Sequence, residues 1–193
     1  MGLFYANLTV YRPQRSALLT ELRRLRREAF VSPTVHGHTV VFDKAIDEQD
    51  TRAIERLGQA VTKALSCSAL VGALHDDDVL YLWLFENGKI RDRYDSSPAY
   101  FDPHCSQPRP PEGGNAKLIC RAFDSPDRQE RVEQLLRADL LEGKLPGIPG
   151  ELERHAALAA ELGLPRFVAG LGYSAIAGGY VPEEFQGVAF EAV

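Results

Sequence analysis

The sequence predicts an α+β protein, in which a mixed sheet is followed by a mainly helical C-terminal part. Segments with strand-like patterns alternate with segments of helical spacing through residues 1–97, and they predict the order β-α-β-α-β-β-β. After a proline-rich loop, helical patterns dominate residues 98–193. A chain of 193 residues with 45% hydrophobic and 25% charged residues has ordinary globular composition, so we expect the two parts to pack as one compact domain.

The first half begins with two strand–helix pairs. Residues 3–10 form the first strand, and a helix begins after Pro13 and continues to about Ala29. The second strand covers residues 39–43, where β-branched side chains cluster, and Asp47 is expected to cap the second helix. The buried stripes of the two helices are Leu18, Leu22, Leu25 and Ala29 in the first and Ile54, Leu57, Val61 and Leu65 in the second.

Three strands separated by short turns complete the sheet, over residues 68–74, 79–85 and 89–95. Asn87-Gly88 is the strongest turn signal, because a type I′ turn needs positive φ at both central residues. A two-residue loop at this point pairs Trp83 with Asp92 and separates an aromatic face from a leucine face. If the aromatic face is buried, Asp92 needs a partner; if the leucine face is the core, Asp92 is exposed.

The second half opens with a long loop over residues 96–113, which holds five of the twelve prolines. Helices are predicted over residues 115–123, from Ser125-Pro126-Asp127 onward, and over residues 151–162. The core face of the middle helix is Val132, Leu135, Leu136 and Leu140, and a linker over residues 143–150 follows. The tail over residues 167–193 is glycine-rich and apolar, and no element is assigned to it.

Charge and cysteine content exclude several classes of protein. The net charge is −5, and the whole excess lies in residues 98–193, because residues 1–97 hold 13 basic and 13 acidic residues. Such a chain lacks the positive field that attracts nucleic acid, and it does not suit anionic membranes. Three cysteines without a Cys-x-x-Cys pair indicate a reducing compartment, and no segment reads as a signal peptide or a membrane span. We expect a soluble cytoplasmic protein without a cofactor, of undetermined oligomeric state.

The end of the last predicted strand carries the densest set of polar side chains. Asp92, Asp95 and Ser96, with His104 further along the loop, are candidate catalytic residues for a small hydrolase-like enzyme. Asp92 and Asp95 point to opposite faces of a strand, so they do not form a simple acid–base pair. The alternative is that Asp95 and Ser96 only cap the turn. No Gly-x-Ser-x-Gly nucleophile elbow is present.

Metal binding has weaker support. His36 and His38 lie two residues apart, so on a strand they share a face and offer two zinc ligands, and His104-Cys105 would complete the set only if the fold brought it there. Asp76-Asp77-Asp78 offers clustered carboxylates for a hard cation, or else a solvated hairpin tip. Cys105 in an exposed loop is also a candidate nucleophile, although the adjacent His104 is awkwardly placed to act as its base.

The same loop region favours binding over catalysis. Tyr94, Tyr100 and Phe101 offer aromatic contact surface, and Gly113-Gly114 before a helix gathers backbone N–H groups that suit an anion. The leading hypothesis is a non-catalytic protein that binds a protein or a small polar ligand through residues 92–114. A cleft with a perturbed carboxylate at Asp92 would favour the enzyme, whereas an exposed apolar patch around Tyr100 and Phe101 would favour the binding protein.

Four short blocks resemble a bacterial protein family without known function. They are Val31-Ser32-Pro33-Thr34, His75-Asp76-Asp77-Asp78-Val79-Leu80, Tyr94-Asp95-Ser96-Ser97-Pro98 and Gly113-Gly114-Asn115-Ala116. The resemblance covers about residues 30–120. It implies a bacterial origin, and it implies no particular activity.

Overall fold

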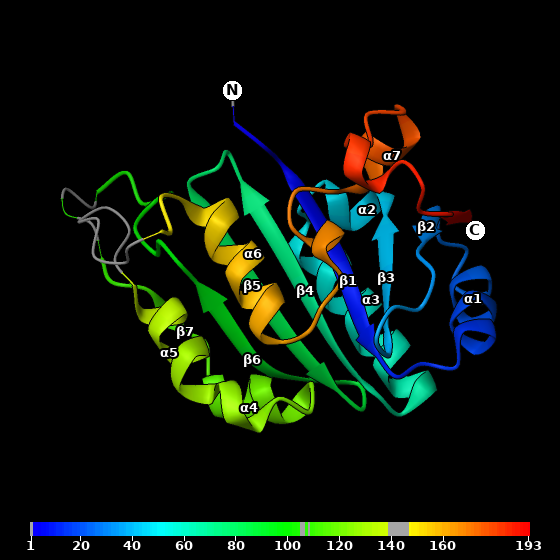
Figure 1. Ribbon diagram of the computed structural model, residues 1–193, viewed down its shortest axis with the longest axis horizontal. Coiled ribbons are helices and arrows are strands. Elements are labelled where there is room, and N and C mark those ends of the chain that lie inside the picture. The colour runs from blue at the N-terminus through cyan, green and yellow to red at the C-terminus, as the bar shows by residue number, and fades with distance from the viewer. Residues whose placement is uncertain (1, 105–106, 108, 139–146) are drawn as a thin grey trace.

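A single eight-stranded sheet forms the centre of the structure (Figure 1), a computed structural model that describes residues 2–104, 107, 109–138 and 147–193. The strand order is β7-β6-β5-β4-β1-β3-β2-β8, and neighbouring strands are antiparallel. The strands are β1 (Tyr5–Tyr11), β2 (Ala29–Val31), β3 (His38–Asp43), β4 (Ser68–His75), β5 (Val79–Glu86), β6 (Lys89–Asp95), β7 (Glu112–Gly113) and β8 (Glu191–Ala192). With 39% helix and 24% strand, the predicted α+β class is confirmed.

The first half of the chain forms a split β-α-β arrangement, in which α1 (Arg15–Arg24) joins the parallel strands β1 and β2 and strand β3 lies between them. The first helix is shorter than predicted: α1 ends at Arg24, and Arg26 has a left-handed φ of 54°. The chain then forms β2, a strand that was not predicted because the helical spacing of apolar residues continues to Ala29. Because β2 reverses the chain before β3, strand β3 runs antiparallel to β1, and the expected mixed sheet is an antiparallel one.

The second helix begins three residues later than predicted. Asp47 ends α2 (Lys44–Asp47), a single turn capped by Asp43, whereas Asp50 caps α3 (Thr51–Leu65) by accepting a hydrogen bond from the Arg52 N–H at 2.8 Å. The Asp47 carboxylate instead accepts hydrogen bonds from other parts of the chain, including the backbone N–H of Ala6 at 3.1 Å. Asp47 therefore ties the α2–α3 corner to β1, and it does not cap the helix that follows it in the chain.

Helices cover both faces of the sheet (Figure 1). On one face, α1 and α3 pack against apolar residues of the central strands, such as Val71 and Phe85. The opposite face packs against α4 (Ala116–Ala122), α5 (Gln129–Arg137), α6 (Glu151–Glu161) and α7 (Tyr173–Ala177). Because β5 is buried on both faces, its sequence is an almost continuous apolar run, and neither face of the β5–β6 hairpin is simply the exposed one.

The β5–β6 hairpin has the predicted turn and a different register. Asn87 and Gly88 have positive φ values of 49° and 78°, as a two-residue turn requires. A β-bulge beside Leu84 then shifts the ladder by one residue, so that Asp92 pairs with Leu84 and not with Trp83. Alternate residues of a strand point to opposite faces, so this shift moves Asp92 from the aromatic face to the leucine face.

The second half of the chain joins the same sheet. The short strands β7 and β8, which were not predicted, pair with β6 and β2 at the two edges. The predicted helices over residues 115–123 and 151–162 correspond to α4 and α6, and Ser125-Pro126-Asp127 leads through a 3-10 turn into α5. Leu140 and residues 143–146 of the expected linker lie outside the described residues. Of the helices described, none combines the length and the apolar character that crossing a membrane requires.

Candidate functional site

The structure separates the four candidate catalytic residues. Asp92 accepts a hydrogen bond from the backbone N–H of Asn115, so its carboxylate ties β6 to the start of α4. Asp95 lies on the opposite face of β6, where burial raises the pKa of its carboxyl group. His104 is exposed in the loop, where its backbone N–H donates to Asp102. Ser96, the fourth of them, lines a cavity.

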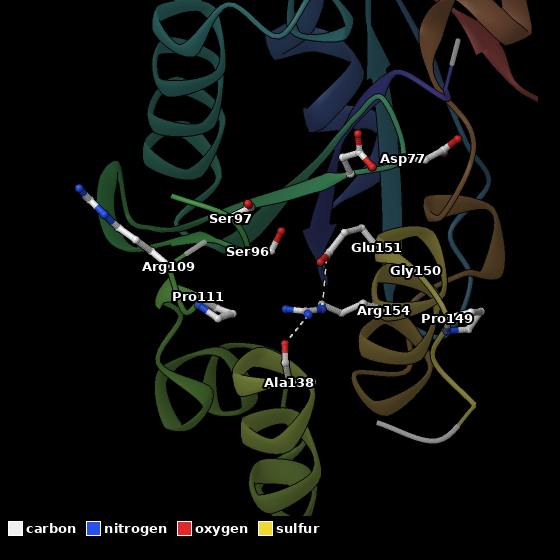
Figure 2. A pocket seen from close by; sticks show the side chains of 11 residues that line it. Asp77, Ser96, Ser97, Arg109, Pro111, Ala138, Pro149, Gly150, Glu151 and Arg154 are labelled. Atoms are coloured by element: carbon white, nitrogen blue, oxygen red, sulfur yellow. Dashed lines mark hydrogen bonds and ion pairs between the residues drawn. The ribbon is translucent and has the colours of Figure 1, made fainter. Parts of the chain in front are cut away.

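Ser96 opens into a cavity of about 180 Å³, which lies between the end of β6 and the start of α6 and which we call the polar cavity (Figure 2). The β4–β5 turn, the loop after β6, the end of α5 and the first turn of α6 contribute to its lining. Its charged and hydroxyl-bearing residues are Asp77, Asp78, Ser96, Ser97, Arg109, Glu151 and Arg154.

Arg154 is the most buried charge of this cavity, with an exposed fraction of only 1%. Its guanidinium donates to the phenol oxygen of Tyr94 and to the backbone carbonyl of Ala138. Its Nε atom lies 3.2 Å from the Glu151 Oε2 atom. A dashed line joins these two side chains in Figure 2. These two atoms attract each other as charges, but neither makes a well-directed hydrogen bond within the described residues. Arg154 and Glu151 therefore line the cavity as a buried ion pair, and a guanidinium at a cavity wall suits an anionic group.

Glu151, the first residue of α6, has a strongly perturbed carboxyl group. Burial raises its pKa to about 7, and the charges of Asp95 and Asp78 act in the same direction. Arg154 and the hydrogen bond from Ser96 oppose this rise without cancelling it. Near neutral pH the carboxyl group is therefore divided between its charged and neutral forms, which is typical of groups at functional sites.

A second buried polar pair lies next along α6. The His155 Nδ1 atom is 2.6 Å from the Tyr5 hydroxyl, and the two rings are stacked with centroids 5.8 Å apart. Burial lowers the pKa of His155 to about 4, so its imidazole is neutral at physiological pH. Gly72 of β4 makes room for this ring, because a Cβ atom at that position would lie 2.6 Å from the imidazole. This pair anchors α6 to the sheet.

Sequence reasoning missed Glu151, Arg154 and His155, although the chain carried a signal for them. The apolar stripe of α6 includes Leu158 and Leu162, both buried. Arg154, His155 and Glu151 continue this stripe toward the start of the helix, because they follow the same spacing of three or four residues. Ionisable residues on a core-facing stripe indicate a buried polar network, and such networks are a reason to search for a site.

The predicted binding residues divide between structural and exposed positions. Tyr94 is buried, and its hydroxyl donates to the Leu136 carbonyl at 3.0 Å. Gly113 and Gly114 both have φ values of 69°, and a Cβ at Gly113 would lie 1.9 Å from a backbone oxygen of β6. These glycines allow close packing of the chain against β6. Tyr100 and Phe101, in contrast, are exposed and contact each other, with ring centroids 4.8 Å apart.

The two histidines of the metal hypothesis do not share a strand face. His36 lies in a tight turn with a φ of 49°, and its side chain is exposed. His38 is buried against the rings of Tyr11 and Phe123, at centroid distances of 5.1 and 5.9 Å. Burial lowers the pKa of His38. Within the described residues no three His, Cys, Asp or Glu side chains are grouped as a metal site would need, and Cys105 lies outside those residues.

The acidic run belongs to the β4–β5 turn. Asp76 and Asp77 have positive φ values of 53° and 63°, a conformation that Asp tolerates in turns. The Asp76 carboxylate accepts from the Gly2 N–H, and Asp78 accepts from the Tyr100 hydroxyl at 3.2 Å. The run therefore closes the hairpin and also holds the exposed aromatic pair of the loop.

Comparisons of the chain with family models, with curated proteins and with solved structures give no match. The resemblance to a bacterial family, the cytoplasmic location and the bacterial origin accordingly stay predictions.

Proposed function

We propose that the protein is a non-catalytic binding protein that holds a small polar ligand in the polar cavity. One observation supports this most strongly: a buried guanidinium and a buried carboxyl group line the same cavity, and each has an atom without a directed hydrogen bond. Buried polar groups are normally satisfied, because each unsatisfied group costs about 1–3 kcal/mol. A ligand that bonds to this ion pair would offset part of that cost.

The charges of the polar cavity favour a ligand that carries both a positive and a negative group. Glu151 and the carboxylates of Asp77 and Asp78 suit an ammonium group, whereas Arg154 suits a carboxylate. The volume of about 180 Å³ is below the 300–1,000 Å³ that is typical of sites for drug-sized ligands. A small zwitterion of the size of a free amino acid meets both conditions.

Thermal unfolding with a matched set of small molecules tests this proposal. Alanine carries both charges, propionate only the negative one and ethylamine only the positive one. The panel also contains the other free amino acids, because the cavity restricts the size and charge of the ligand more closely than the type of its side chain. A ligand at a hundredfold excess over its Kd stabilises by about 2.7 kcal/mol, which raises Tm by roughly 5–10 °C for a chain of this size. We expect such shifts only with zwitterions.

Two variants of α6 identify the site. Glu151→Gln keeps the shape of the cavity and removes its inner negative charge, so it should abolish the ligand-induced shift. Glu153→Gln changes an exposed carboxylate in the same first turn of the helix and should leave the shift intact. Equal shifts from propionate and alanine would contradict the zwitterion, and no shift from any member of the panel would contradict the proposal as a whole.

A catalytic role is the second candidate, and the state of Glu151 favours it. A carboxyl group with a pKa of about 7 beside the Ser96 hydroxyl is suited to general base chemistry at neutral pH. The hydrolysis of p-nitrophenyl acetate tests this. An enzyme would show a rate that rises through about pH 7 and is lost in both Ser96→Ala and Glu151→Gln, whereas a binding protein would show the uncatalysed rate.

A further inference from the structure

A second cavity lies on the other side of the β4–β5 turn, against the face of the sheet that α3 covers. It has a volume of about 610 Å³, within the usual range for small-molecule sites, and we call it the aromatic cavity. Ala73 of β4 and Tyr81 and Trp83 of β5 contribute the sheet part of its lining. The α2–α3 corner and the side chains of Phe4 and Phe101 contribute the rest. The cavity shares no lining residue with the polar cavity.

Aromatic rings dominate this lining. Phe4 and Phe101 are 46% and 61% exposed, whereas Trp83 is 8% exposed. Tyr81 lies beside Trp83 with ring centroids 5.8 Å apart. Phe4 and Phe101 both contact the His75 ring, so they form one exposed apolar patch, and a patch of this kind favours a site of interaction. The cavity therefore offers four ring systems to whatever enters it.

The rings are held in place before any ligand binds. The His75 ring makes edge contacts with Phe4 at 4.6 Å and with Phe101 at 4.9 Å between centroids. The Gln49 amide donates to the Leu74 carbonyl at 2.6 Å, so its oxygen faces the His75 Nδ1 atom at 2.8 Å, and that nitrogen is the donor. Gln49 thus orients His75, and His75 orients the two phenylalanines. A preorganised site loses less entropy on binding.

The charged side chains among the described residues that line the aromatic cavity are acidic. Asp47 and Glu48 line it, and no lysine or arginine is among the described residues that do so. Asp47 is committed to hydrogen bonds with the backbone of Ala6 and Ser174. Glu48 is exposed, and its charge acts on the nearby Lys44 ammonium, which itself donates to Glu28 at 2.8 Å. The positive end of α3 also points to this corner, but the Asp50 carboxylate caps it.

We propose that the aromatic cavity binds a small organic cation of the substituted-ammonium class. Aromatic faces attract a cation through the ring quadrupole, and tryptophan does so most strongly. Glu48 adds a negative charge beside Lys44, and none of the described residues that line the cavity is a lysine or an arginine. The apolar part of the ligand then replaces water on the four rings, while its charged centre lies among their faces.

Three molecules of equal shape separate charge from size. Choline carries a trimethylammonium group, 3,3-dimethylbutan-1-ol replaces its nitrogen with neutral carbon, and 3,3-dimethylbutanoate carries a negative charge. Trp83 is the single tryptophan of the chain, so its fluorescence reports binding at this site. We expect a saturable change with choline at millimolar concentration, with a Kd about tenfold lower than for the neutral alcohol, and no change with the anion.

Variants at exposed positions test the site without disturbing the fold. Phe101→Leu retains an apolar side chain and removes one ring, so it should weaken choline binding roughly two- to fivefold and leave the alcohol unaffected. Glu48→Gln should weaken choline in the same direction. Tyr180→Leu removes another exposed ring, 80% exposed and outside the cavity lining, and should change neither affinity.

Three outcomes would overturn the inference. They are the lack of a saturable Trp83 response to choline, equal affinity for choline and the neutral alcohol, and unchanged choline affinity in Phe101→Leu. The result is independent of the polar cavity, since Glu151→Gln should leave the choline response unchanged.

Discussion

The two cavities on either side of the β4–β5 turn differ in how their chemistry is built. The polar cavity depends on ionisable groups that are almost wholly buried: Arg154 is 1% exposed and Glu151 is 7% exposed. The aromatic cavity depends on rings at its mouth that remain largely in solvent, such as Phe101 at 61%. A binding group that is buried also supports the fold, whereas an exposed one does not. If the two cavities bind ligands as proposed, binding and stability are coupled in the first cavity and separable in the second.

Replacement of Arg154 should have the largest effect on the free energy of unfolding. A small effect would contradict the contrast between the two cavities. Arg154→Leu removes the donor that the Tyr94 hydroxyl and the Ala138 carbonyl share, and it removes the charge that faces the Glu151 carboxylate. Removing one partner of a buried ion pair typically costs 3–5 kcal/mol, so we expect a loss of about that size in the free energy of unfolding by urea. Arg166→Leu, at an exposed position, is the control. A loss below about 1 kcal/mol would show that the charge is not coupled to the fold.

The pH dependence of stability also tests whether the buried ionisable groups of α6 are coupled to the fold. The folded pKa of Glu151 is about 7, above its ordinary value of 4.5, so the folded state binds more protons and this contribution is lost as pH rises through 7. The folded pKa of His155 is about 4, below its ordinary 6.5, so its contribution is present above 6.5 and is lost as pH falls toward 4. The two trends oppose each other between about pH 4.5 and 6.5.

Glu151→Gln separates these two trends. Without the Glu151 titration, stability should rise with pH up to about 6.5 and then level off. Relative to the original protein, the variant should gain roughly 2 kcal/mol between pH 5 and pH 8, measured by urea unfolding at each pH. A difference between the two proteins that is the same at every pH would contradict the assigned pKa of Glu151.

The packing beneath the polar cavity gives a smaller effect. In Gly72→Ala the new Cβ atom would lie 2.6 Å from the His155 ring, which is itself held against Tyr5. Overpacking of this kind costs about 1–3 kcal/mol, and we expect a loss in that range on thermal unfolding. Gly187→Ala has no atom within 4 Å of the new Cβ and should be nearly neutral. Equal effects of the two changes would mean that His155 moves aside freely.

The smallest effect on stability should come from the rim of the aromatic cavity. Phe101→Leu affects an exposed side chain, so the free energy of unfolding should change by less than about 0.5 kcal/mol while choline binding weakens. Urea unfolding measured beside the fluorescence titration checks both. A stability loss above 1 kcal/mol would show that this ring belongs to the core and that the two cavities are not separable in the way proposed.

The elements with strong local sequence signals were predicted correctly, and those with conflicting signals were missed. The Asn87-Gly88 turn and the three strands around it carry unambiguous patterns, and they form as expected. Strand β2 was missed because Leu25 and Ala29 continue the helical spacing of α1, although the helix ends at Arg24. The pairing of β2 with β3 is a tertiary contact, and such a contact can override a weak local preference for helix.

For the candidate site, the sequence located the region and not the residues. Ser96 and the loop after it do line the polar cavity, as the strand-end argument favoured. Asp92 was misplaced because a single β-bulge inverted the faces of β6, and a bulge of this kind has no turn signal in the chain. Arg154 and Glu151 come from a helix more than fifty residues away, so only the folded chain brings them to Ser96.

By itself, the sequence determined the class of the fold, the strong turns and the acidic character of the second half, because these depend on composition and on neighbouring residues. The tertiary structure decided the antiparallel order of the sheet, the face on which Asp92 lies and the meeting of Glu151, Arg154 and Ser96. It also decided which ionisable groups lose their water, and so the perturbed pKa of Glu151, because desolvation is a property of the packed chain and not of any segment of it.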